Sequence, residues 1–287
     1  MPRIPPITAD AGLPNFARRH GLLGAALSGT ALLGCAGASP SPQDDLARLM
    51  SGLAPACRLT PTETEGPFPL RAALAGDRLL RADITEGLPG VPLALRIRLV
   101  DVNRGCRPIA GAWVYVWHCD RDGRYSGYDG LGSAGRAGEA FLRGIRQSDA
   151  DGCVTFRSVY PGWYEGRITH VHCMVFLAGG PLSSTSPSVA TTQFAFPDAA
   201  TAAVYASPRY GKGPNTSVTR LEDDNVFADG AGAEMLTLVG SVAAGFAAGI
   251  VVGVDPTASH PVLSEGPPPG PPPGGPQRLP RRRGAPT

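Results

Sequence analysis

The protein has 287 residues, of which 43% are hydrophobic and 17% are charged, and its formal net charge is +2. This balance excludes a nucleic-acid-binding protein that relies on a basic surface, and it also excludes a disordered acidic protein. The 38 glycines and 30 prolines disfavour an all-helical fold and favour turn-rich β structure.

The first 35 residues have the pattern of an export signal. Arg18 and Arg19 precede a weakly hydrophobic run over 21–34, which is too short to span about 30 Å of hydrocarbon as a helix. The paired arginines are typical of twin-arginine signals, and Leu32–Cys35 resembles a lipobox. We therefore expect a signal peptide over 1–35, lipidation of Cys35 as the sole membrane contact, and a periplasmic or cell-surface location. The alternative is an ordinary signal cleaved near residues 36–38.

The remaining chain divides by composition into three parts. Residues 36–56 are expected to be a tether, and residues 57–256 a single folded domain. Residues 257–287 contain runs of three prolines and a basic patch, Arg281–Arg283, which predicts an extended, disordered tail.

The hydrophobic pattern of the domain has the two-residue period of β-strands. Short Gly- and Pro-containing turns at 149–152 and 160–162 separate some of the runs. This pattern predicts an all-β fold with an antiparallel β-sandwich core and long active-site loops. The expected strands cover 92–101, 113–118, 153–159, 168–176, 234–242 and 246–254.

The five cysteines beyond Cys35 support an oxidising compartment, where disulfides are expected. Because five is an odd number, at least one thiol stays free or pairs elsewhere. Among several possible pairings we expect one disulfide between Cys106 and Cys153. The five are Cys57, Cys106, Cys119, Cys153 and Cys173.

His170 and His172 are the clearest candidate metal ligands. Residues two apart on a strand point to the same face, so both imidazoles can reach one metal ion. The third histidine of the domain, His118, is expected to be structural rather than a ligand.

A series of separate motifs closely resembles the intradiol ring-cleavage dioxygenases, the catechol and protocatechuate 3,4-dioxygenase family. The resemblance extends over nearly all of 57–256 and is strongest to the exported, single-domain members. Its motifs are Thr60–Pro61, Glu65–Pro67, Trp117–Asp120, Gly123–Ser126, Phe141–Gly144, Asp149–Gly152, Phe156, Pro161–Arg167, His170–His172, Thr192–Gln193 and Phe196–Asp198.

The resemblance implies one mononuclear Fe(III) held by Tyr125, Tyr164, His170 and His172. Ferric iron is a hard acid that favours anionic oxygen ligands and accepts imidazole. The implied reaction is cleavage of a catechol-type ring by O2 between its two hydroxyl-bearing carbons, which gives a muconate-type diacid.

The resemblance also implies three catalytic residues, Arg167, Gln193 and Tyr164. Arg167 would place a fixed positive charge beside the substrate ring, and Gln193 would lie near the same site. Tyr164 would leave the iron and accept a proton when the substrate chelates. Phe68 stands where relatives often have tyrosine, which bears on substrate choice.

Three further arginines, Arg136, Arg143 and Arg146, are available to meet a substrate carboxylate. Two other functions remain open from the residues alone. One is an exported β-sandwich lipoprotein that binds carbohydrate or peptide without catalysis. The other is a zinc or copper hydrolase that uses His118, His170 and His172, although an HExxH motif is absent.

Overall fold

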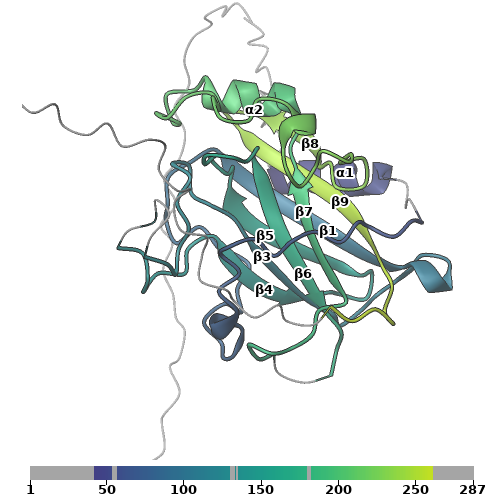
Figure 1. Ribbon diagram of the computed structural model, residues 1–287. Helices are drawn as coiled ribbons and strands as arrows, with labels where there is room; N and C mark the ends of the chain where they lie inside the picture. Colours follow the sequence, from purple (N-terminus) through teal and green to yellow (C-terminus); the bar gives the residue numbers. More distant parts are fainter. Residues whose placement is uncertain (1–41, 54–56, 130–132, 134, 180–181, 261–287) are drawn as a thin grey trace, which may run out of the picture. The chain divides into compact units, whose positions relative to one another are not determined.

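The computed structural model describes residues 42–53, 57–129, 133, 135–179 and 182–260 (Figure 1). The expected signal peptide with Cys35, and the tail from residue 261 onward, lie outside these residues. Within the described chain, no helix is long and apolar enough to cross a bilayer. The helices and strands are α1 Pro42–Gly52, β1 Pro92–Asp101, β2 Arg107–Pro108, β3 Trp113–Trp117, β4 Arg143–Gln147, β5 Cys153–Val159, β6 His170–Phe176, β7 Ala190–Ala195, α2 Asp198–Tyr205, β8 Thr237–Ser241 and β9 Gly245–Val254.

The strands form two sheets, which confirms the predicted β-sandwich (Figure 1). The first sheet has the order β2-β1-β9-β8, with β5 paired to β1. The second has the order β4-β3-β6-β7, and all its pairs are antiparallel. One pairing departs from the antiparallel expectation, because β9 runs parallel to β1 from Leu93↔Phe246 to Asp101↔Val254.

The core between the sheets is built by alternate side chains of several strands. On β6, Val171, Cys173 and Val175 belong to this core. The intervening residues of β6 therefore point to the opposite face of the second sheet. There Met174 packs in a second cluster with Trp117 and other side chains, so the sequence period alone directs the two histidines of β6 away from the core.

The folded unit extends beyond the expected limits at both ends. Helix α1 lies within the segment expected to be a tether, and its Leu46 and Leu49 are buried against Ala94 and Ala247. The tether expectation is therefore wrong for residues 42–52. At the other end the His260 backbone N–H donates to the Ser188 carbonyl at 2.8 Å, four residues past the expected boundary.

The disulfide joins Cys57 to Cys106, whose Cα atoms are 5.5 Å apart. The expected Cys106–Cys153 pairing is wrong: Cys153 is a buried free thiol, as are Cys119 and Cys173. The disulfide ties the segment after α1 to the turn that follows β1.

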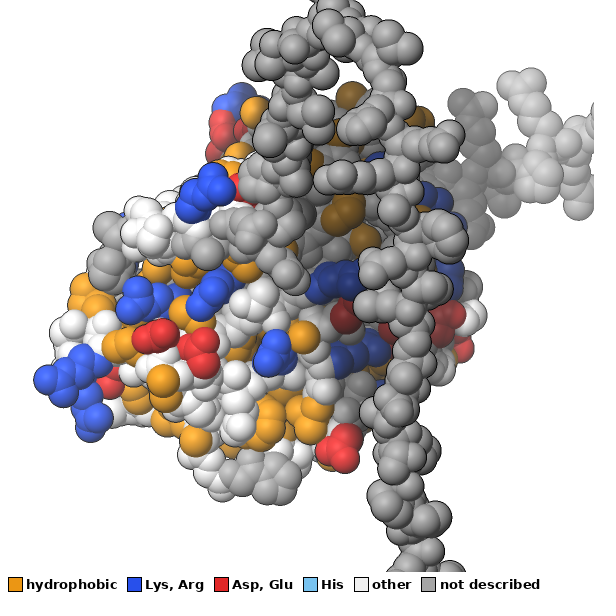
Figure 2. All heavy atoms as spheres, turned by 180° about the vertical axis from the view of Figure 1, so that it is seen from behind, with side chains coloured by type: hydrophobic (Ala, Val, Ile, Leu, Met, Phe, Trp, Pro, Cys, Tyr) orange, Lys and Arg blue, Asp and Glu red, His pale blue; other side chains and the backbone are white. Residues whose placement is uncertain are grey.

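On the face seen in Figure 2, basic and acidic side chains are interspersed among hydrophobic ones.

Candidate metal centre

His170 and His172 are both buried on the outer face of the second sheet, with exposed fractions of 2% and 1%. The His170 Nδ1 lies 2.7 Å from the Ile168 carbonyl oxygen, which can only accept, so Nδ1 carries the proton. The His170 Nε2 therefore presents a lone pair, and it lies 3.2 Å from the His172 Nε2. The His172 ring stacks on Trp117, with ring centres 4.7 Å apart.

Two phenols reach the same point from irregular segments. Tyr125 lies between β3 and β4, and Tyr164 lies between β5 and β6. The Tyr125 Oη is 3.4 Å from the His170 Nε2, and the Tyr164 Oη is 3.1 Å from the same atom. The structure thus brings together all four residues that the sequence analysis proposed as metal ligands.

The electrostatics of this group suit a metal ion. Burial, together with the charge of Arg167, lowers the pKa of His170 to about 3, and burial likewise lowers the pKa of His172 well below its usual value. Both imidazoles are therefore neutral at pH 7 and present lone pairs. The Nδ1 of His172 is buried without a hydrogen-bond partner among the described residues, and lone-pair donors held this close together need a cation or proton between them.

The two phenols are neutral unless a cation lies beside them. Burial raises the pKa of Tyr164 to about 12 and raises the pKa of Tyr125 well above its usual value. A metal ion that binds both oxygens must displace both protons, as metal binding does at other ionisable ligands. Two phenolates and two imidazoles form a donor set for a hard cation of high charge.

The loop over 64–70 closes one side of the centre. Gly66 has φ of +69°, and a Cβ atom there would lie 3.0 Å from the His172 Cε1. Only glycine combines this backbone angle with so close an approach. Two residues further on, the Phe68 ring stacks on the Tyr125 ring with centres 4.5 Å apart, so the loop fixes one histidine and one tyrosine.

Arg167 belongs to a buried network beside the four residues. Its Nη2 donates to the Gln193 Oε1 at 2.8 Å, and its Nε donates to the Asp224 carboxylate at 3.0 Å. The Gln193 Nε2 donates to the Thr64 carbonyl at 2.9 Å. The Arg167 Nη1 makes no hydrogen bond with the described residues, which leaves this N–H group for a ligand oxygen.

Asp224 was missed by the sequence analysis. Its Oδ2 accepts the Ile168 backbone N–H at 2.8 Å, and its Oδ1 accepts the Val226 N–H at 2.9 Å. These bonds and Arg167 hold the pKa of Asp224 below its usual value against the opposing effect of burial. The only signal in the sequence was the acidic run 222–224, whose other members are not buried.

His118 does not join the centre. Its Nδ1 lies 2.8 Å from the Cys119 carbonyl oxygen and its Nε2 lies 2.7 Å from the Ser158 Oγ, so both ring nitrogens are engaged. Across the described residues, no group of three or more His, Cys, Asp or Glu side chains is placed to hold a metal. The proposed three-histidine zinc or copper site is therefore wrong.

The three arginines considered for substrate recognition lie in different surroundings. Arg143 is wholly buried and donates to the Phe68 and Ser126 carbonyls, both at 2.8 Å, and to the Tyr115 Oη at 2.9 Å. It is therefore not available to a substrate carboxylate. Arg136 pairs with Glu139 at 3.0 Å, and Arg146 is exposed.

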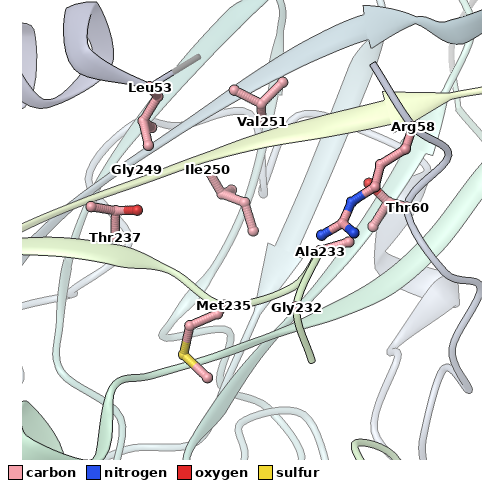
Figure 3. Close-up of a pocket in the computed structure, with 10 residues that line it drawn as sticks. All are labelled: Leu53, Arg58, Thr60, Gly232, Ala233, Met235, Thr237, Gly249, Ile250 and Val251. Atoms are coloured by element: carbon pink, nitrogen blue, oxygen red, sulfur yellow. The ribbon is translucent and has the colours of Figure 1, made fainter. Parts of the chain in front are cut away.

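A separate hollow of about 170 Å³ lies where β8 and β9 meet the segments before β1 and β8 (Figure 3). Arg58 is the one charged side chain among its lining residues, which include Met235 and Ile250. None of the four predicted ligands lines this hollow, so it has no part in the metal chemistry.

Comparison with known proteins agrees with this geometry. Residues 64–181 match a family model described as Dioxygenase. An intradiol ring-cleavage dioxygenase from Tetranychus urticae has a solved structure that is 25% identical, with a TM-score of 0.58, over 70% of this chain and 96% of that one. The chain is similar to the intradiol ring-cleavage dioxygenases. The matched range 64–181 includes Tyr125, Tyr164, His170 and His172, but not Gln193 or Asp224.

Two curated relatives come from Acinetobacter lwoffii. Catechol 1,2-dioxygenase 1 is 29% identical over 153 residues, which are 47% of this chain and 45% of the relative. Catechol 1,2-dioxygenase 2 is 36% identical over 108 residues, or 37% of this chain and 36% of the relative. The matched region thus spans less than half the length of these family members.

Proposed function

We propose that the protein is a non-heme Fe(III) dioxygenase that cleaves a catechol-type ring with O2 between the two hydroxyl-bearing carbons and releases a muconate-type diacid. The observation that carries the proposal is that two phenol oxygens and the His172 Nε2 all lie within 3.4 Å of the His170 Nε2. The named family members act on catechols, which supports the substrate class.

Tyr125, Tyr164, His170 and His172 would hold the iron, and their donor set fits a ferric ion. Bound there, the iron would hold the substrate and make its ring reactive toward O2. Both hydroxyl protons of the catechol must leave before its two oxygens can bind as anions. The phenolate oxygen of Tyr164 is the group on this chain that accepts one of them.

Arg167 acts on the substrate rather than on the metal. Its Nη1 is free to meet an oxygen of the bound ring, and its positive charge stabilises negative charge that develops there. The bonds from Nε to Asp224 and from Nη2 to Gln193 hold the guanidinium in one orientation. Gln193 is thus a positioning residue, tied in turn to the Thr64 carbonyl.

The test is the colour, iron content and O2 consumption of the purified protein. Two tyrosinates on ferric iron give an intense visible charge-transfer band, and catechol should be consumed with one O2 for each ring. Arg146→Gln, an exposed change outside the centre, is the matched control. A colourless protein that takes up iron without catechol-dependent O2 consumption would contradict the proposal.

Export and lipid anchoring remain part of the proposal. The Cys57–Cys106 disulfide supports an oxidising compartment, and Leu32–Cys35 resembles a lipobox. Cys35→Ser should release the protein into the soluble fraction or block its processing. Unchanged membrane association of this variant would contradict the anchor.

A further inference from the structure

The segment that carries Tyr164 and Arg167 has little structure of its own. Its start is tied down by the Gly162 N–H, which donates to the Asp120 carbonyl at 3.0 Å, and its end enters β6 at His170. Between these points, its only internal backbone hydrogen bond joins the Arg167 N–H to the Tyr164 carbonyl at 3.4 Å. The position of Tyr164 therefore depends on contacts from elsewhere in the chain.

Lys212 supplies the first of these contacts. Its Nζ donates to the Trp163 carbonyl at 2.7 Å and lies 3.8 Å from the centre of the Trp163 ring. The Trp163 Nε1 donates in return to the Gly213 carbonyl at 2.9 Å. Gly123, with φ of +87°, makes room for the Trp163 carbonyl, because a Cβ there would lie 2.2 Å from that oxygen. The residue immediately before Tyr164 is thus held on three sides.

Asn215 and Ser217 hold the other end of the same segment. The Asn215 Nδ2 donates to the Arg167 carbonyl at 2.8 Å, and the Gly166 N–H donates to the Ser217 Oγ at 2.7 Å. The Asn215 Oδ1 accepts the Ser217 N–H at 2.9 Å, so one side chain both shapes the 212–217 turn and fastens Arg167. We call Lys212, Asn215 and Ser217 the brace.

We propose that the brace sets how fast Tyr164 leaves and re-enters the metal centre, with Lys212 as a positioning residue whose charge and hydrogen bond slow that exchange. The inference rests on the proposed function, in which Tyr164 departs when catechol binds. It names residues outside the centre that govern this step.

The amine of Lys212 can be modified chemically. It is exposed, and it is the single lysine of the chain. Its hydrogen bond and its cation–π contact both go to Trp163, so removing its charge loosens one segment and leaves the sandwich core intact. Acylation of this amine removes the charge, and we expect it to act like Lys212→Met.

The first experiment measures hydrogen exchange in the metal-free protein. Lys212→Met should speed the exchange of a peptide that contains the Gly166 amide about tenfold, the order expected for loss of an exposed charged hydrogen bond and a cation–π contact. Lys212→Arg should stay close to wild type. Arg220→Met, which breaks an exposed ion pair with Glu222 on the next segment, is the matched control for charge loss. Unchanged exchange in Lys212→Met overturns the inference.

The second experiment follows catechol binding to the iron-loaded protein by anaerobic stopped flow, so that turnover does not contribute. Lys212→Met should bind catechol roughly threefold to tenfold faster in the phase assigned to Tyr164 departure, as expected if an exposed cation–π contact opposes it. Acetylation should reproduce this change in wild type and have no effect on Lys212→Arg, in which no lysine remains.

The outcomes separate the two claims. A wild-type protein that holds iron but binds no catechol overturns the proposed function. Catechol binding to wild type at a rate that neither Lys212→Met nor acetylation changes overturns the inference alone, and leaves the proposed function in place.

Discussion

The two tyrosines of the metal centre are held in different ways. Tyr125 is 1% exposed, and its ring lies against Phe68. Its backbone N–H donates to the Ser133 Oγ at 2.9 Å, and the buried guanidinium of Arg143 lies 5.9 Å from its ring centre. Every one of these contacts is buried, so Tyr125 can move only if the packing around it opens.

Tyr164 is only partly buried, and it is held through its neighbours by the brace. Lys212, the main contact to the residue before it, is exposed. Contacts of this kind are weaker and open more readily than buried ones. The comparison teaches that one phenol is fixed by buried packing and the other is held through more exposed contacts, although both lie within 3.4 Å of the His170 Nε2.

The largest effect should come from Arg167→Ala, which tests whether Arg167, on the same segment as Tyr164, acts on the substrate rather than on the metal. We expect turnover to fall about 100- to 1000-fold, the loss typical of one electrostatic group in a catalytic site. Iron content and the visible band should be retained. Steady-state O2 uptake and metal analysis check this, and loss of iron from the variant would show that the assigned role is wrong.

Exchanging the phenol at each position tests the comparison directly. Tyr125→Phe should weaken iron binding on the order of a hundredfold or more, since even partners outside the metal's own ligands cost up to that much. Tyr164→Phe should keep much of its iron but bind catechol slowly, because its proton acceptor is gone. Iron titration and stopped-flow spectra measure both effects, and the reverse pattern would reverse the two assignments.

Arg143→Met should remove the buried support of Tyr125. The carbonyls of Phe68 and Ser126 lose their donor, which should destabilise the protein by about 2 kcal/mol. Arg143→Lys should recover part of this loss, and Arg146→Met, three residues along on the exposed end of β4, should change little. Denaturant unfolding of the metal-free proteins measures the difference; equal stability of wild type and Arg143→Met would remove the contrast between the two tyrosines.

The smallest effect concerns Glu234, which lies away from the surroundings of both tyrosines. Its titration contributes a pH dependence of stability that does not come from the metal centre. Burial raises its pKa to about 7, its Oε1 accepts the Thr192 hydroxyl at 2.8 Å, and its Oε2 has no partner among the described residues. Because the folded pKa lies above the unfolded value, its ionisation lowers stability as pH rises from about 4.5 to 7.

Glu234→Gln should abolish that loss. Relative to wild type, the variant should gain on the order of 1 to 2 kcal/mol between pH 5 and pH 8. Thermal unfolding of the metal-free proteins at both pH values measures the gain, with the exposed Glu222→Gln as control. A difference that does not change with pH would show that Glu234 is not protonated in the folded state.

The sequence predicted the strands whose residues alternate in polarity or are rich in β-branched and aromatic side chains. Strands β1 and β5 begin and end at the predicted residues, because one face of each is wet or half-buried. Strand β7 was missed because its sequence, Ala-Thr-Thr-Gln-Phe-Ala, has no regular alternation of apolar and polar residues. Helix α1 was missed because it depends on packing against β1 and β9, and local propensity says little about such contacts.

The residues of the candidate site also differ in how far the sequence alone could predict them. The spacing of His170 and His172 on a strand indicated a shared face from the residues alone. Tyr125 and Tyr164 lie on irregular segments where spacing carries no geometric meaning, so only the family resemblance pointed to them. Asp224 could not be found, because its partner Arg167 lies 57 residues away. The same holds for Cys57, whose partner is set by the path of the chain after α1.

The parallel pairing of β9 with β1 bears on how this chain is made. The strand that completes the first sheet, Gly245–Val254, is the last of the domain to be synthesised, and it lies between β1 and β8. Until it emerges, β1 has an unpaired edge that can bind other extended chains. The pairing of strands that are far apart in the sequence, as β1 and β9 are, is also slow. Assembly of the sandwich must therefore wait until β9 has been translated, and nascent chains that stop before residue 245 should be the species most prone to aggregate.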